Sequence, residues 1–145
     1  MKVSHTLLRF ETEHGINLHD ISQEVQRCID DSGVQNGTAV IGSLHTTTAI
    51  TINEHEMRLL DDVKTFLTRI IPPDDRYLHN DIHLRDCPQD EPENAHSHLA
   101  SMLLGNSESV AIVDGQLMLG QWQSIMLVEL DGSRQRKVSV QIMGV

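Results

Sequence analysis

The sequence predicts an α+β fold in which helices pack on a largely antiparallel or mixed β-sheet. Two segments with helical spacing of apolar residues, 17–33 and 54–71, alternate with stretches rich in Val, Ile and Thr. The last third of the chain places two Asp-Gly pairs between apolar runs, which is typical of β-hairpins. At 145 residues, the chain is expected to form one domain over residues 1–145.

The first third of the chain is expected to form a strand over 3–11 and then a helix. Asn17 is the expected helix cap, and Gly33 is a natural stop. The apolar residues between them recur at helical spacing: Leu18, Ile21, Val25, Cys28 and Ile29.

The middle of the chain is expected to form two strands, a helix and an irregular segment. The strands cover 38–44 and 48–53, with a bend at 45–47, and the helix ends at Pro72-Pro73. Residues 72–93 have neither helical nor strand period. A segment this long is usually either functional or disordered, and we expect it to act as a lid or pocket rim.

The rest of the chain is expected to form a short helix and an antiparallel meander. The helix runs from Asn94 to Gly105 and is expected to bury Leu99, Met102 and Leu103. Asp114-Gly115 and Asp131-Gly132 are the expected hairpin turns.

Composition excludes several classes of function. The formal net charge of −10 and the lack of a basic stripe argue against nucleic-acid binding. No apolar run could cross a membrane, and the first residues lack a secretory signal, so we expect a cytoplasmic protein. The common nucleotide-binding, redox and serine hydrolase motifs are absent.

Nine histidines are many for this length, and several of them cluster with acidic residues. His45 ends a strand, His79 and His83 lie in the irregular segment beside Asp81, and His96 and His98 open the short helix. Imidazole and carboxylate groups can hold a divalent ion, zinc or magnesium, or transfer protons near neutral pH. A surface or hydrogen-bonding role is the alternative for each of them.

Other candidate residues have a structural and a functional interpretation. Glu54 either supports the dipole of the following helix or enters a site. Trp122 and Gln123 either cover the core or line a pocket, and Arg134 pairs with Glu129 or Asp131 or receives an anion.

Three motifs, in the order in which they occur, resemble the YjbQ-like family over about residues 5–143. They are HTTTAITINEHE, NAHSHLASMLLG and GQLMLGQWQSIMLVELDGSRQRKV. The resemblance implies an α+β fold, a homotrimer and a polar pocket in which metal ions have been seen, and some members are described as secondary thiamine-phosphate synthases. The family segments fall on His45–Thr47, Thr51–Glu54, Asn94–His98, Gly120–Gln123 and Glu129–Arg134.

These observations lead to one main hypothesis, a metal-centred enzyme acting on a small, phosphorylated substrate. Its expected catalytic residues are His45, Glu54 and Asp81, and its expected metal ligands are His45, His79 and His98. Its expected substrate-binding residues are Thr46, Thr47, Asn53, Asn94, Trp122, Gln123 and Arg134. The alternatives are a metal-assisted hydrolase and a non-catalytic trimer that binds a metal or a small ligand.

Overall fold

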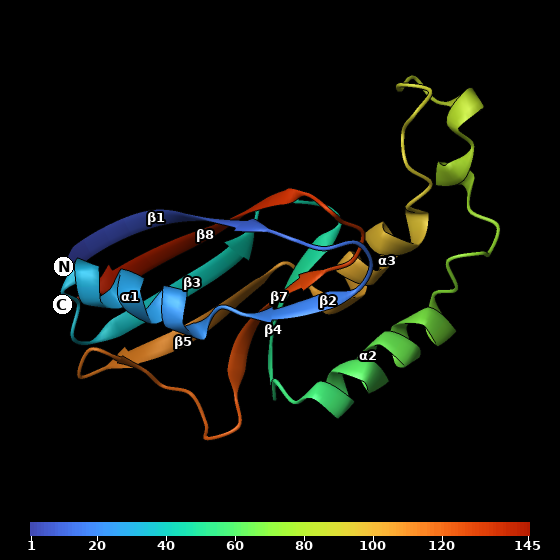
Figure 1. Ribbon diagram of the computed structural model, residues 1–145. Helices are drawn as coiled ribbons and strands as arrows, with labels where there is room; N and C mark the ends of the chain where they lie inside the picture. Colours follow the sequence, from blue (N-terminus) through green and yellow to red (C-terminus); the bar gives the residue numbers. More distant parts are fainter.

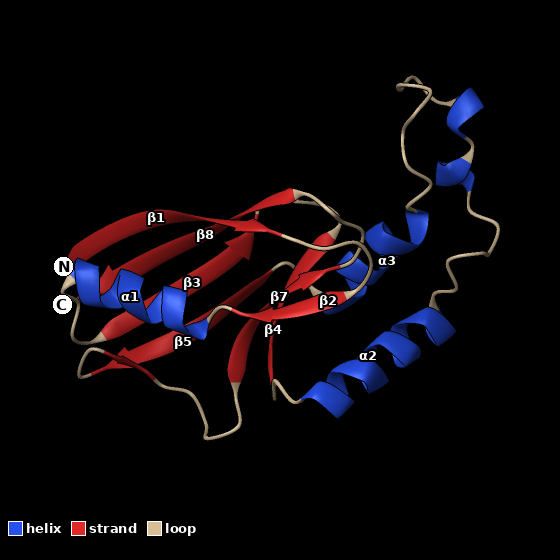
Figure 2. Ribbon diagram, viewed as in Figure 1, coloured by secondary structure: helices blue, strands red, loops and turns tan.

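Two antiparallel sheets and three α-helices make up the computed structural model, which describes residues 1–145 (Figures 1 and 2). The larger sheet has the strand order β1-β8-β3-β5-β6, with bounds Lys2–Glu11, Gln135–Gly144, Gly37–Ser43, Ser107–Val113 and Gln116–Leu117. The smaller sheet has the order β2-β7-β4, with bounds Asn17–Asp20, Ser124–Glu129 and Thr48–Asn53. The predicted α+β class, with helices on antiparallel sheets, is confirmed.

The smaller sheet is the middle layer of the molecule. Successive side chains of a strand point to opposite faces, so the central strand β7 contributes to two cores. Ile125 and Leu127 pack in the core shared with the larger sheet and helix α1 (Ser22–Ser32). Met126 and Val128 pack in a second core with helices α2 (Met57–Ile70) and α3 (Ala95–Leu104). Burial of both faces explains the unbroken apolar run of β7.

The first helix begins later than predicted. Asn17–Asp20 is strand β2 and pairs with β7, so the prediction of a cap at Asn17 is wrong. Helix α1 follows Asp20, whose carboxylate accepts hydrogen bonds from the Ser22 backbone N–H and hydroxyl at 2.9 and 2.6 Å. The helix ends at Gly33 in the left-handed conformation (φ 64°), as predicted.

The second helix is capped by Glu56. The Glu56 carboxylate accepts hydrogen bonds from the backbone N–H groups of Arg58 and Leu59 at 3.0 and 2.7 Å, and these bonds lower its pKa. Glu54 therefore lies ahead of the helix and is free of this capping role. No helix of the chain is both long and apolar enough to span a bilayer.

Only the first of the two predicted hairpins is present. Asp114 and Gly115, with φ angles of 50° and 76°, join β5 to β6. The second prediction is wrong, because β7 and β8 lie in different sheets and Asp131-Gly132 belongs to the crossover between them. Two apolar faces place β7 in the middle layer, where β2 and β4 are its neighbours.

Helix α3 buries the face opposite to the predicted one. The buried residues are the small ones, Ala95, Ser97, Ala100 and Ser101. The Ser97 and Ser101 hydroxyls each donate a hydrogen bond of 2.6 Å, to the carbonyl oxygens of Leu130 and Thr48. Such close approach requires small side chains, so Leu99, Met102 and Leu103 point outward and are exposed.

The irregular segment predicted over 72–93 forms an arm that projects from the body of the molecule (Figure 1). It contains two short 3₁₀ turns, Leu78–Asn80 and Ile82–Leu84. A second, shorter projection is the loop between β6 and β7 (Figure 1). The function of the arm as a lid stays a prediction.

Candidate functional site

Two crossovers between the sheets meet at one end of the molecule, beside the start of helix α3. Residues 44–47 connect β3 to β4, and residues 130–134 connect β7 to β8. The Leu130 N–H donates a 3.2 Å hydrogen bond to the Thr47 carbonyl oxygen, which ties the crossovers together. The Ser97 and Ser101 hydroxyls anchor α3 on the same region. Three segments distant in sequence thus present polar side chains to one place.

A buried ion pair lies beneath the crossovers. Arg136 donates to the two carboxylate oxygens of Glu129 from Nε and Nη2 at 2.7 and 2.6 Å, and both side chains are almost fully buried. The same carboxylate accepts hydrogen bonds from the Thr12 hydroxyl and from the backbone N–H groups of Leu130 and Asp131. Burial raises the pKa of Glu129, but the hydrogen bonds from Arg136, Thr12 and Asp131 lower it by a larger amount. The pKa of Glu129 is therefore below its usual value, and the carboxylate stays ionised.

A second, more exposed pair fixes the rim of the site. Asp131 Oδ2 accepts hydrogen bonds from Arg134 Nη1 at 2.6 Å and from Asn94 Nδ2 at 2.7 Å. Arg136 Nη2 donates to the Thr47 hydroxyl at 2.9 Å. Both carboxylate oxygens of Glu129 and Oδ2 of Asp131 are therefore engaged, whereas Arg134 Nη2, Arg136 Nη1 and the Thr46 hydroxyl have no hydrogen-bond partner in the chain.

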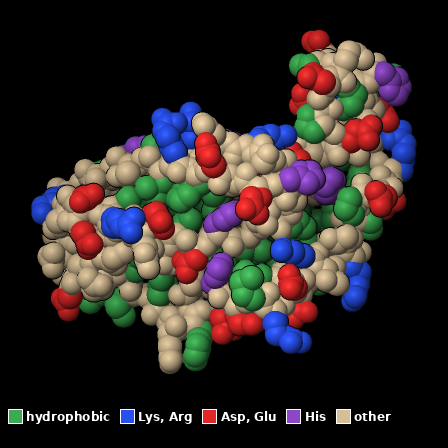
Figure 3. All heavy atoms as spheres, viewed as in Figure 1, with side chains coloured by type: hydrophobic (Ala, Val, Ile, Leu, Met, Phe, Trp, Pro, Cys, Tyr) green, Lys and Arg blue, Asp and Glu red, His purple; other side chains and the backbone are tan.

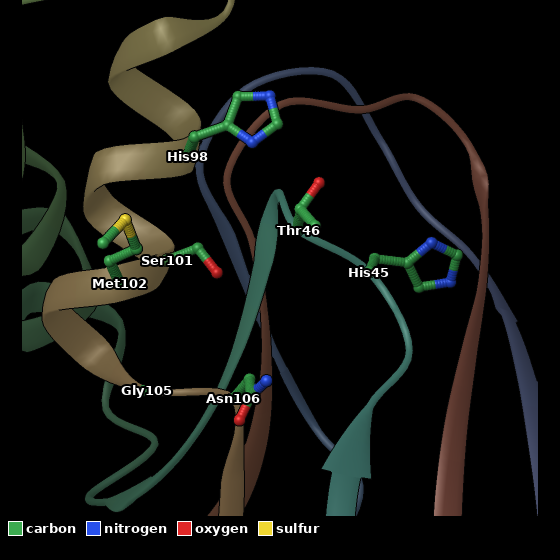
Figure 4. Close-up of a pocket in the computed structure, with 7 residues that line it drawn as sticks. All are labelled: His45, Thr46, His98, Ser101, Met102, Gly105 and Asn106. Atoms are coloured by element: carbon green, nitrogen blue, oxygen red, sulfur yellow. The ribbon is translucent and has the colours of Figure 1, made fainter.

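Two adjoining hollows of about 480 and 490 Å³ open at this place and share His45, Thr46 and His98. We call the larger hollow and its polar lining the His–Arg pocket; this lining comprises His45, Thr46, Thr47, Asn94, His98, Arg134 and Arg136, with Glu91 of the arm at the edge. The His98 side chain from α3 and the Thr46 side chain from the crossover between β3 and β4 both line the opening (Figure 4). Histidine side chains gather on the surface where the arm joins α3 (Figure 3).

The two pocket histidines are held in the neutral form. Burial lowers the pKa of His45, and the Arg136 charge lowers it further. Its ring turns toward β8 (Figure 4), where Nε2 accepts a 2.8 Å hydrogen bond from the Lys137 N–H, so the neutral ring carries its proton on Nδ1. Burial and the neighbouring His79 lower the pKa of His98, although Asp131 opposes this shift.

The comparisons with known proteins agree with this fold. The family model described as UPF0047 protein YjbQ-like matches residues 6–145. The chain belongs to the YjbQ-like UPF0047 family. A UPF0047 protein of Methanothermobacter thermautotrophicus is 40% identical over 99% of this chain and 94% of its own length. The UPF0047 protein YugU of Bacillus subtilis is 33% identical over 94% of this chain and 97% of its own length.

Solved structures give the same result. The crystal structure of a protein of unknown function from Sulfolobus solfataricus matches with a TM-score of 0.89 and 35% identity, covering 99% of both chains. A hypothetical protein from Aeropyrum pernix matches with a TM-score of 0.88 and 32% identity, covering 98% of this chain and 99% of that one. These relatives establish the family and the fold and name no reaction.

In this YjbQ-like chain, the predicted site residues separate into two groups. The first group lines the His–Arg pocket and comprises His45, Thr46, Thr47, Asn94, His98 and Arg134. Asn53, Glu54, Trp122 and Gln123 line another hollow of about 410 Å³ at the far end of β4. Trp122 does not cover the core, since 67% of it is exposed.

The remaining predicted residues lie on the arm. The His79 ring contacts the His98 ring edge to face, with 4.7 Å between the ring centres. Asp81 does not line the pocket and forms an ion pair of 2.7 Å with Arg76. Of the two histidines at the start of α3, His98 lines the pocket, whereas His96 Nδ1 is buried without a partner.

The predicted metal ligands do not form a three-ligand site within one chain. Catalytic zinc sites usually use three protein ligands, and no three His, Cys, Asp or Glu side chains converge here. His79 and His98 are adjacent, but the Nε2 lone pair of His45 is engaged by the Lys137 N–H. The residues of one chain therefore do not fit a complete metal centre.

Sequence reasoning missed the buried residues that organise the site, Thr12, Glu129 in its structural role and Arg136. A signal for Arg136 is present in the sequence. In β8, buried residues alternate, and Arg136 occupies the inward positions together with Val138, Val140 and Ile142. A charged residue on an inward face needs a buried partner, and Glu129 is a candidate because it ends the buried apolar run of β7.

The depressed pKa values of His45 and His98 predict that acid lowers stability. Because both pKa values lie below the ordinary histidine value of 6.5, the unfolded chain takes up protons first as the pH falls. The free energy of unfolding should therefore decrease as the pH falls from about 7.5 to about 5.5. Urea unfolding of a His45→Gln/His98→Gln variant should show a weaker decrease than the parent protein. The control variant His5→Gln should show the same decrease as the parent protein. An equal decrease in the double variant would refute His45 and His98 as the origin of the acid sensitivity.

Proposed function

We propose that the His–Arg pocket binds the anionic group of a small phosphorylated molecule and that His98 transfers a proton in a reaction on it. The protein would then be a cytoplasmic enzyme whose reaction releases or transfers phosphate or pyrophosphate. One observation supports this most strongly, the gathering of two arginines, two neutral histidines, hydroxyls and an amide around one hollow.

The donors of the pocket suit an oxyanion because they are fixed before a ligand arrives. Arg136 is held by Glu129, and Arg134 and Asn94 are held by Asp131. Guanidinium groups bind phosphate oxygens with charge-assisted hydrogen bonds, and fixed donors stabilise charge without reorganising. Such a site matches a substrate whose leaving group is phosphate or pyrophosphate, as in the thiamine-phosphate synthase activity that the resemblance implies.

His98 suits proton transfer for two reasons. Its ring nitrogens have no hydrogen-bond partner in the chain, and its lowered pKa provides the neutral base near pH 7. His45 is instead held by Lys137 and offers Nδ1–H as a donor. We therefore assign proton transfer to His98 and ligand orientation to His45.

The experiment screens small phosphorylated compounds for release of phosphate or pyrophosphate. His98→Gln should lower turnover of the active compound by about 100-fold or more, the usual contribution of general acid–base catalysis, with little change in pyrophosphate affinity. His83→Gln, a change of the same kind on the arm, is the control and should keep full turnover. Pyrophosphate binding without turnover of any compound would instead support the non-catalytic binding protein.

A metal-dependent form of this enzyme is the second candidate, favoured by the contact between His79 and His98. Two imidazoles can hold a divalent ion, zinc or magnesium, when water, substrate or another subunit supplies the other ligands. Elemental analysis of untagged protein, supplemented with metal, should then find near-stoichiometric ion that a His79→Ala/His98→Ala variant loses. Equal metal content in both proteins, or none in either, would refute this candidate.

A further inference from the structure

We propose that a second copy of the chain covers the His–Arg pocket with the end of β4 that carries Glu54 and Trp122. The inference rests on the proposed function and states how the two separated groups of polar residues come together. It identifies which two surfaces of the chain would meet.

Within one chain the two groups cannot share a ligand. They lie at opposite ends of β4, which has six residues. A strand rises roughly 3.3 Å per residue, so the ends of β4 are about 20 Å apart. Glu54 of one chain therefore cannot act on a small molecule held by His98 of the same chain.

Exposed apolar side chains lie beside the His–Arg pocket. Met102 and Leu44 are 80% and 57% exposed beside the opening, and Leu99 and Leu103 continue this surface along α3. An apolar face of a helix next to a polar pocket is typical of a surface that another protein covers.

Exposed apolar side chains also lie at the far end of β4. Trp122 is 67% exposed beside Glu54. Met57, close in sequence to Glu54, is 71% exposed, and Met118, close in sequence to Trp122, is 58% exposed. Hydrophobic side chains are visible at the tip of the projecting loop between β6 and β7 (Figure 3). Exposed tryptophan and methionine are enriched in protein interfaces.

Charge decides which surface pairs with which. Glu54 is a partly buried residue, and its carboxylate forms no hydrogen bond or ion pair in the chain. The His–Arg pocket lacks a free carboxylate, because Glu129 and Asp131 already bind arginines of the same chain. Its Arg134 and Arg136 guanidinium groups have N–H groups without a partner. The occupant that these features fit is a second copy, presenting Glu54 and Trp122 to the pocket.

Contact between two different surfaces has a consequence for assembly. A chain that uses one surface to cover a neighbour and offers the other surface to a third copy builds a closed ring, or a filament if the rotation does not close. A closed ring would contain one such pocket per subunit, each with Glu54 from one subunit and His98 from the next.

Cross-linking tests the proposed contact without relying on ligand binding. In a Cys87→Ser background, with Cys28 buried, one protein carries Met102→Cys and another carries Trp122→Cys. After mixing and treatment with a short bismaleimide, covalent dimers should form that contain one chain of each kind. Met102→Cys mixed with Val3→Cys is the control and should give no such dimer. Dimers of Met102→Cys alone, or no mixed dimer, would overturn the proposal.

Charge reversal provides the second measurement and uses variants that leave the core unchanged. Glu54→Lys should raise the concentration at which the assembly half-dissociates by about tenfold or more, whereas Asp31→Lys on α1 should not. Sedimentation measures this, and pyrophosphate binding is measured on the same samples. Equal sedimentation of both variants and the parent protein would refute the inference, even if pyrophosphate binding supports the proposed function. Loss of assembly in Glu54→Lys alone would support the inference, even if pyrophosphate does not bind.

Discussion

Replacing Glu129 with alanine is expected to lower the free energy of unfolding by about 3–5 kcal/mol, the typical cost of removing one partner of a buried ion pair. The variant leaves the buried Arg136 guanidinium without its carboxylate and frees the Thr12 hydroxyl and two backbone N–H groups. Urea unfolding of the parent protein and the variant, followed by circular dichroism, measures the loss.

A double variant separates the cost of the lone charge from the cost of the missing side chain. Glu129→Leu/Arg136→Met removes both charges and retains apolar volume, so it should be clearly more stable than Glu129→Ala. A loss below about 1 kcal/mol in Glu129→Ala would mean that the pair does not organise the crossovers. The pair also predicts acid sensitivity, because the lowered pKa of Glu129 means that its stabilisation is lost as the pH falls below about 4.5.

Replacing Arg134 with glutamine is expected to weaken pyrophosphate binding by about 10- to 100-fold. Hydrogen bonds to charged groups contribute about 1.5–3 kcal/mol, and the variant removes the more exposed of the two pocket guanidiniums. Isothermal titration with inorganic pyrophosphate measures the change in affinity.

Arg76→Gln is the matched control for that change. It removes the same charge from the arm, where Arg76 is paired with Asp81 and does not line the His–Arg pocket. The control should keep most of the parent affinity, and an equal loss in both variants would show that only net charge matters. Raising the salt concentration should weaken binding to the parent protein and the control alike, since the ligand is anionic.

Local patterns in the sequence were enough to predict much of the fold. Strands over 38–44 and 48–53, the stop at Gly33 and the turn at Asp114-Gly115 depend on nearby residues, and all are present. The family resemblance, carried by three motifs in order, is confirmed by the match over residues 6–145.

The wrong predictions concern contacts between distant segments. Asp131-Gly132 has the local form of a hairpin turn, but the two apolar faces of β7 place that strand in the other sheet. Helix α3 was expected to bury its largest apolar residues, yet the hydrogen bonds of Ser97 and Ser101 to the crossovers turn its small residues inward. The spacing of apolar residues along one element does not show which distant segment packs against it, so it could not predict the neighbours of β7 or the buried face of α3.

The candidate site shows the same division between local and distant information. The residue types near His45, Asn94 and Arg134 predict a polar pocket, and those residues do line one hollow. The sequence motif from His45 to Glu54 reads as one unit, but a strand runs between its ends, so Glu54 lies in a different hollow from His45. Residues a few positions apart along an extended strand lie far apart in space, because each residue adds roughly 3.3 Å.

A crystal structure of the protein soaked with inorganic pyrophosphate tests the proposed anion site most directly. We expect the anion in the His–Arg pocket, bonded to Arg134 and Asn94 and within hydrogen-bond distance of His98. Pyrophosphate bound elsewhere with that pocket empty, or no bound pyrophosphate at concentrations that saturate binding in solution, would contradict the proposal.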